Sequence, residues 1–166
     1  VGRYFSVPVD KMDVIYNGVD YKKFEFDWTE AERAEWRKRF ALPEEKIVMY
    51  VGRFVREKGI HVLLNAASAV LAQEPDTKFL IVGGGHREKF EKFVRWYGLE
   101  EKVLFTGFMA NRSLHQVYRV ADVSVFPSLY EPFGIVALEG MAAGAAVVTS
   151  DAGGLKEVVQ HEKTGT

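Results

Sequence analysis

Short, continuous runs of β-branched and other apolar residues recur along the chain, separated by longer amphipathic stretches. These runs occupy positions 14–16, 47–51, 79–82, 103–105, 123–126 and 145–148. Their hydrophobicity is continuous rather than alternating, which is typical of strands buried on both faces of a parallel sheet. The pattern therefore predicts about six strands in a largely parallel sheet.

The stretches between the runs carry apolar residues at helical spacing. Thr29 and Glu32 form a capping-box pattern that predicts a helix through about Phe40. Further helices are predicted over 59–73, 86–97 and 134–143, before 120 and from 155. This alternation predicts a doubly wound α/β fold with helices on both faces of the sheet. Ligands of such sheets bind beyond the carboxyl ends of the strands, so the loops there are the candidate site.

Composition narrows the class of protein. The 166 residues suit a single domain over 1–166, with 1–27 as a linker and first strand. A net charge of −1 gives no reason to expect a nucleic-acid partner, and the lack of cysteine excludes disulfides and thiolate metal sites. No apolar run reaches the roughly 20 residues of a membrane span. We expect a cytoplasmic protein without a membrane segment.

Neither a metal site nor a complete protein is expected from the sequence. The four histidines are scattered and no Asp-x-Asp pair occurs, so no divalent metal is predicted to hold a ligand. The chain begins at Val1 and ends at Thr166 directly after a turn-like Lys-Thr-Gly. We expect that it has been cut at both ends from something longer.

Two glycine-containing loops follow the runs at 47–51 and 79–82. The first brings the cations Arg53, Arg56 and Lys58 to one strand end, next to a predicted helix N-terminus. This pattern fits an anion site, and it equally fits a solvated loop whose charges pair with Glu57. The second loop, 83–85, is three glycines, which allow close approach to the backbone or simply form a tight turn.

The loop after the run at 123–126 is the most informative. Glu131 precedes a glycine-opened helix, and Glu139 is the one charge in that otherwise apolar helix. A buried carboxylate must be protonated, paired with a cation, or hydrogen-bonded to hydroxyl groups of a ligand. Both an internal ion pair and a phosphorylated-sugar site fit this pattern, since free helix amides would bind phosphate and carboxylates would bind hydroxyls.

These motifs together resemble a known enzyme family. Glu131 and Glu139 form a Glu-x7-Glu motif within Pro-Ser-x-Tyr-Glu-Pro-Phe-Gly, and the loop at 52–59 and Asn17-Gly18-Val19-Asp20 complete the pattern. The chain from about Val14 to Thr166 resembles the C-terminal, Rossmann-like, nucleotide-sugar-binding half of retaining GT-B glycosyltransferases. The most similar group is family four, which includes glycogen-synthase-like and sucrose-synthase-like enzymes.

The resemblance implies a role for each motif. Arg53 and Lys58 would bind the donor diphosphate, Glu131 would contact the transferred sugar, and these three would be the catalytic residues. Glu139 would hold the ribose hydroxyls. The remaining donor contacts would come from the backbone of Phe108 and Met109 at the base, from Gly84 and Gly85 at the cleft, and from the amides of Phe133, Gly134, Ile135 and Val136 at the sugar and distal phosphate.

The implied reaction is hexose transfer with retention, using a nucleotide-diphosphate sugar and no metal or other cofactor. Glucose from ADP-glucose or UDP-glucose is the expected donor sugar, and a glycan such as α-glucan the expected acceptor. The acceptor site belongs to a preceding domain in this family, so residues 1–166 alone are expected to bind nucleotide without catalysing transfer. A GDP-mannose-dependent mannosyltransferase domain, a non-enzymatic nucleotide- or sugar-phosphate-binding module, and a hydrolysing or epimerising relative remain alternatives.

Overall fold

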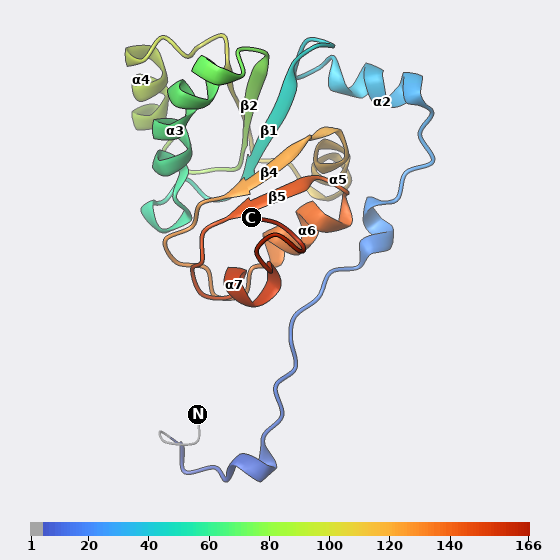
Figure 1. The fold of residues 1–166 in the computed structure, drawn as a ribbon, viewed down its shortest axis with the longest axis vertical. Helices are drawn as coiled ribbons and strands as arrows, with labels where there is room; N and C mark the ends of the chain where they lie inside the picture. Colours follow the sequence, from blue (N-terminus) through green and yellow to red (C-terminus); the bar gives the residue numbers. More distant parts are fainter. Residues whose placement is uncertain (1–4) are drawn as a thin grey trace.

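A parallel five-stranded sheet forms the centre of the computed structural model, which describes residues 5–166 (Figure 1). The strands are β1 (Lys46–Val51), β2 (Thr77–Val82), β3 (Val103–Gly107), β4 (Val123–Phe126) and β5 (Ala146–Thr149), in the order β3-β2-β1-β4-β5. The chain winds outward from β1 to β3 and then crosses to the other side of β1. The doubly wound, Rossmann-like α/β prediction is confirmed.

Five of the six predicted strands are present, and the prediction of a strand at 14–16 is wrong. Val14, Ile15 and Tyr16 are 79%, 91% and 72% exposed, in a linker segment (residues 5–27) whose first part extends away from the domain (Figure 1). This segment contains two short 3₁₀ turns, Val9–Lys11 and Tyr21–Phe24 (η2). An apolar run becomes a strand only where a neighbouring strand accepts its hydrogen bonds, and none lies beside 14–16 within the described residues.

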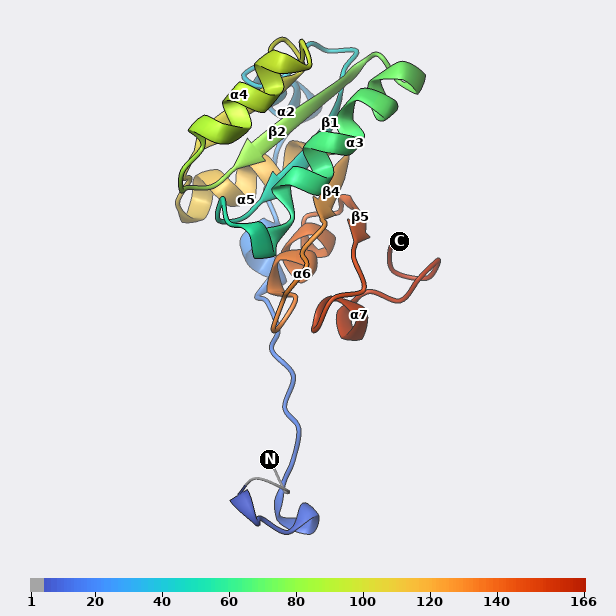
Figure 2. The ribbon, with the colours of Figure 1, turned by 90° about the vertical axis from the view of Figure 1, so that its left-hand side faces the viewer.

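Helices cover both faces of the sheet, as the pattern predicts. The helices α3 (Ile60–Gln73) and α4 (Glu88–Trp96) pack on one face. The helices α5 (Asn111–Val120) and α6 (Ile135–Ala142), together with α7 (Leu155–Val158), pack on the other. Figure 2 shows α3 and α4 in front of the sheet and α5 on its far side. Alternate β1 residues face opposite cores, Met49 with α5 and α6, and Tyr50 with α3 and α4.

The helix α2 (Glu30–Arg37) begins at the predicted capping box. Glu32 N donates to Thr29 Oγ1 at 3.2 Å, and Thr29 N donates to Glu32 Oε2 at 2.8 Å. The helix ends at Arg37, earlier than the predicted Phe40, because the next residues form a turn that leads into β1. Arg37 Nη2 lies 2.5 Å from Asp122 Oδ2, which fixes the helix to the amino end of β4.

None of the helices within residues 5–166 combines the length and apolar character needed to cross a membrane.

Candidate nucleotide-sugar site

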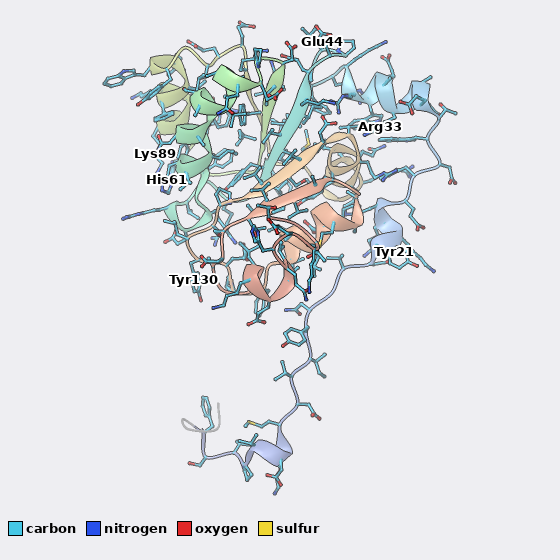
Figure 3. The ribbon with its side chains drawn as sticks, in the orientation of Figure 1. Tyr21, Arg33, Glu44, His61, Lys89 and Tyr130 are labelled. Atoms are coloured by element: carbon cyan, nitrogen blue, oxygen red, sulfur yellow. The ribbon has the colours of Figure 1, made fainter. Side chains whose placement is uncertain are left out.

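The loops that follow β1 and β4 lie against each other at the centre of the sheet. Gly59 has φ +68°, and a Cβ at that position would lie 1.7 Å from the carbonyl oxygen of Pro127. The carbonyl oxygen of Glu57 accepts hydrogen bonds from the amides of Leu129 and Tyr130, at 2.8 and 3.1 Å. Glycine at 59 therefore allows two loops from distant parts of the sequence to dock through their backbones. Figure 3 shows Tyr130 at the rim of the domain, on the β4 loop.

This docking brings Lys58 to Glu131. Lys58 Nζ donates to Glu131 Oε2 at 2.6 Å, and Ser128 Oγ lies 3.5 Å from the same oxygen. Glu131 is only 7% exposed, so its charge needs a partner. Of the three possibilities for a buried carboxylate, pairing with a cation is the one present at Glu131. The alternative pairing of the loop cations with Glu57 does not describe Lys58, since Glu57 acts through its backbone.

A third loop supports Glu131 from behind. Gly154 N donates to the carbonyl oxygen of Glu131 at 2.8 Å. Gly153 has φ +53°, and a Cβ there would lie 2.1 Å from the same carbonyl oxygen. The small residues after β5 therefore hold the Glu131 backbone in place. The sequence indicates only that they form a turn.

The amino end of α6 opens beside this pair. Gly134 is its N-cap residue, with φ +71°. Within residues 5–166, no carbonyl or side-chain acceptor binds the amides of Phe133, Gly134, Ile135 and Val136. Four amides at a helix start, next to a lysine, form a concentration of positive potential that suits an anionic group.

Glu139 lies on α6 and faces α5. Tyr118 Oη donates to Glu139 Oε2 at 2.9 Å. Burial raises the pKa of Glu139, while the Tyr118 hydrogen bond and the nearby His115 oppose that rise. The hollow that Glu139 lines has a volume of about 480 Å³ and is bounded by α5, α6 and the linker segment, through Gly18, Val19, Asp20, Lys23, Phe24 and His115.

Tyr118 and His115 were not predicted as site residues. Their positions on α5 follow the apolar spacing of a core helix, so the sequence offers no signal beyond burial. Their proximity to Glu139 arises only because α5 and α6 pack on the same face of the sheet.

The remaining predicted residues lie in the loops around the same edge. The Arg53 side chain is exposed and makes no ion pair with any residue of 5–166. Gly84 O accepts from Phe54 N at 2.8 Å, and a Cβ on Gly84 would meet no atom of the described residues within 4 Å. Gly85, by contrast, has φ +129° and lies against Phe54. Thus Gly84 faces open space, whereas glycine at 85 is needed for a backbone conformation that other residues rarely adopt.

Beyond β3, Phe108 is 80% exposed, whereas Met109 is half-buried against the core. An exposed aromatic ring and a free backbone segment at this strand end leave a surface on which a planar group can rest. In the part of the chain that the structure describes, no three carboxylate or histidine side chains come together as metal ligands.

Comparison with known proteins identifies the family. A family model described as glycosyl transferases group 1 matches residues 32–166. The chain belongs to the group 1 glycosyltransferases. This group 1 domain is 41% identical, over 97% of its length and 42% of the relative's, to an uncharacterized glycosyltransferase of Methanocaldococcus jannaschii. It is 36% identical, over 95% of its length and 43% of the relative's, to a GDP-mannose-dependent phosphatidylinositol monomannoside mannosyltransferase of Mycobacterium tuberculosis.

The group 1 domain also matches solved structures. The crystal structure of Anabaena HepE in complex with UDP and glucose superimposes with a TM-score of 0.81 and 30% identity, over 92% of this chain and 42% of that one. The five-stranded fold is thus that of GT-B glycosyltransferase C-terminal domains. The group 1 domain spans less than half the length of these relatives.

Proposed function

We propose that this group 1 domain is the donor-binding domain of a retaining, family-four hexosyltransferase that uses a nucleotide-diphosphate sugar. The observation that carries the proposal is the contact of Lys58 with Glu131 beside the open amino end of α6. This arrangement offers a cation and free amides to a diphosphate, and carboxylates to sugar hydroxyls. The complex of HepE with UDP and glucose supports it.

In this proposal, the positive groups stabilise the departing diphosphate. Negative charge grows on the leaving group as the glycosidic bond to the diphosphate breaks. Lys58, the exposed Arg53 and the amides of Ile135 and Val136 would oppose that charge, and removing one such group raises the barrier by about 2–4 kcal/mol. Because protein groups supply this charge, we propose that no metal or other cofactor is needed.

The carboxylates would act on the hydroxyl groups. Glu131 is fixed by Lys58, Ser128 and the β5 loop, so its position suits a group that orients the transferred sugar and stabilises positive charge at the anomeric carbon. Glu139 would bind the ribose hydroxyls. Phe108 and Met109 would contact the base, and Gly84 and Gly85 would leave space beside the donor.

Glucose from UDP-glucose or ADP-glucose is the proposed donor, with a glycan such as α-glucan as the acceptor. The 36% identity to a GDP-mannose-dependent mannosyltransferase supports a second candidate, mannosyl transfer from GDP-mannose. Since the relatives are more than twice as long as this chain, we propose that the acceptor binds a preceding domain. Residues 1–166 alone would then bind nucleotide without transferring sugar.

Calorimetric titration of the chain with UDP, ADP and GDP tests donor binding. One of the three is expected to bind, and Lys58→Ala should weaken that binding at least about tenfold. Glu35→Ala, on the exposed side of α2, is the control and should leave the affinity unchanged. If none of the three binds, the proposal is wrong.

Transfer itself is tested in the longer protein that also carries an acceptor domain. There, Glu131→Ala should abolish turnover while nucleotide affinity is retained, whereas a purely binding module would show no turnover to lose. Free or epimerised sugar formed from the donor without an acceptor would instead indicate a hydrolysing or epimerising relative. Sugar transfer by residues 1–166 alone would contradict the proposal that the acceptor binds a separate, preceding domain.

A further inference from the structure

Tyr118 contacts Glu139, although the proposed function assigns Tyr118 itself no contact with the donor. It lies in the last turn of α5, is 0% exposed, and its hydroxyl group donates to Glu139 Oε2 at 2.9 Å. No hydrogen bond within residues 5–166 involves the second oxygen, Glu139 Oε1. One carboxylate oxygen is therefore fixed by the protein, while the other is left for a partner from outside it.

Tyr118 is itself held in place by the linker segment. Phe24, at the end of η2, is 2% exposed and packs edge-on against the Tyr118 ring with centroids 5.9 Å apart. The same phenylalanine lies 4.5 Å from the His115 ring. The turn η2 contacts both α5 and α6, so Phe24 covers one side of the Tyr118 ring and α6 lies on another.

The contact lies at the edge of the hollow of about 480 Å³ described above, which Glu139 shares with the linker residues Gly18, Val19 and Asp20. A glutamate side chain has three rotatable torsions, and holding one of its oxygens removes most of that freedom before a ligand arrives. A carboxylate prepared in this way suits two adjacent hydroxyl groups, because its free oxygen accepts from them without a further loss of side-chain entropy.

We propose that Tyr118 is the positioning residue of Glu139. It fixes Oε2 so that Oε1 points to the vicinal hydroxyl groups of a ribose in the hollow, and Phe24 supports Tyr118 from the linker segment. This inference rests on the proposed function, because it assigns the ribose of a nucleoside diphosphate to this hollow. The competing explanation is that Tyr118 is a core residue whose hydroxyl group merely needs an acceptor.

The two explanations differ in how they depend on the ligand's hydroxyl groups. Tyr118→Phe removes the hydroxyl and keeps the ring. A positioning role predicts that this variant binds UDP, or whichever of UDP, ADP and GDP binds best, about tenfold more weakly. It also predicts unchanged affinity for the 2′,3′-dideoxy form of the same nucleotide. Tyr97→Phe, at an exposed ring on the opposite face, is the matched control and should bind both nucleotides as the unaltered chain does.

A second variant keeps the proposal testable if Tyr118→Phe does not fold. Phe24→Leu leaves Tyr118 and Glu139 chemically intact but removes the ring contact, so a smaller loss with the same dependence on the ligand's hydroxyl groups is expected. If the variants weaken the ribose and dideoxy nucleotides equally, or leave binding of the best-bound nucleoside diphosphate unchanged, the positioning role is wrong. Failure of the unaltered chain to bind any nucleoside diphosphate would overturn the proposed function itself, and the positioning role with it.

A measurement without ligand completes the test. The Tyr118 hydrogen bond opposes the rise that burial causes in the pKa of Glu139. Removing the hydroxyl should therefore raise that pKa further, as followed by carbon NMR of the Glu139 carboxyl group during a pH titration. An unchanged Glu139 titration in Tyr118→Phe would show that the hydrogen bond does not hold the carboxylate, and would overturn the proposal.

Discussion

Lys58 Nζ and Glu131 Oε2 lie 2.6 Å apart, although 73 positions separate the two residues in the sequence. The contact joins the loops after β1 and β4, strands that are neighbours in the sheet but not in the chain. It places a cation and a carboxylate at the point where the winding of the sheet reverses. In open α/β sheets this is the place where ligands bind.

Removing the lysine should destabilise the fold as well as weaken binding. Lys58→Met leaves the buried Glu131 carboxylate without its cation, and we expect a loss of about 2 kcal/mol in the free energy of unfolding. The value lies below that of a fully buried pair because the Lys58 side chain is 21% exposed. Urea denaturation measures the change. The double variant Lys58→Met/Glu131→Gln should recover much of the loss, and simple additivity of the two changes would contradict the pairing.

Glu139 should make stability depend on pH in a specific direction. Because burial raises its pKa in the folded state, the folded chain holds this proton more tightly than the unfolded chain. Its contribution to stability is therefore greatest at acid pH and falls as the pH rises through the folded-state pKa. Glu139→Gln keeps an acceptor for Tyr118 but has no charge to bury.

We therefore expect Glu139→Gln to match the unaltered chain below about pH 4 and to be more stable near neutrality. Urea titrations at several pH values give the difference directly. A variant that is less stable at neutral pH would show that the ionised carboxylate contributes favourably to folding, against this prediction. The same variant should bind nucleotide more weakly if Glu139 accepts ribose hydroxyl groups.

Substitution of Gly84 should affect nucleotide binding without affecting the stability of the fold. In the part of the chain that the structure describes, a Cβ at this position meets no atom within 4 Å, so Gly84→Ala should change the free energy of unfolding by no more than about 0.5 kcal/mol. The added methyl group would nevertheless enter the proposed donor cleft and should weaken nucleotide binding. Gly59→Ala is the contrasting variant, since its methyl group would collide with the Pro127 carbonyl, and it should destabilise the fold by more than about 2 kcal/mol. Calorimetry and urea denaturation of both variants check the contrast. Normal nucleotide affinity in Gly84→Ala would remove this glycine from the site.

Arg37 should matter for folding alone. It bonds to Asp122 Oδ2 at 2.5 Å and to the carbonyl oxygens of Val120 and Glu45, at the amino ends of the strands. Arg37→Met should cost about 2 kcal/mol of stability, because the partly buried Asp122 carboxylate loses its cation and two carbonyl groups lose a donor. Nucleotide affinity of the folded variant should not change. The control is Lys38→Ala, which breaks only an exposed pair with Glu35 and should cost less than about 0.5 kcal/mol. A change in nucleotide affinity in Arg37→Met would contradict a purely structural role.

The sequence predicted elements well where local pattern and tertiary packing agree. The runs at 47–51 and 79–82 became central strands, and the Thr29–Glu32 capping box began a helix. Val14, Ile15 and Tyr16 show the limit of this reasoning. Their pattern matches a strand, but strand formation also needs a partner for the backbone, and a run of apolar residues does not reveal whether one is present.

The motifs around Glu131 and Glu139 indicated the position of the candidate site, because two glutamates flank a glycine-opened helix directly after a predicted strand. Sequence reasoning left open whether the carboxylates were paired, protonated or held for a ligand. The structure separates the two cases: Glu131 has a lysine, whereas Glu139 has a tyrosine hydroxyl group and a raised pKa.

The sequence by itself determined the alternation of strands and helices, the capping of α2 and the family motifs, since each depends on residues close together in the chain. Only the tertiary structure decided that Lys58 binds Glu131, that Tyr118 binds Glu139 and that Phe24 of the linker segment packs behind Tyr118. These contacts depend on the order of strands in the sheet and on which helices share a face. Both are set by the packing of the whole domain, because burial and hydrogen bonding must be satisfied over all of it at once.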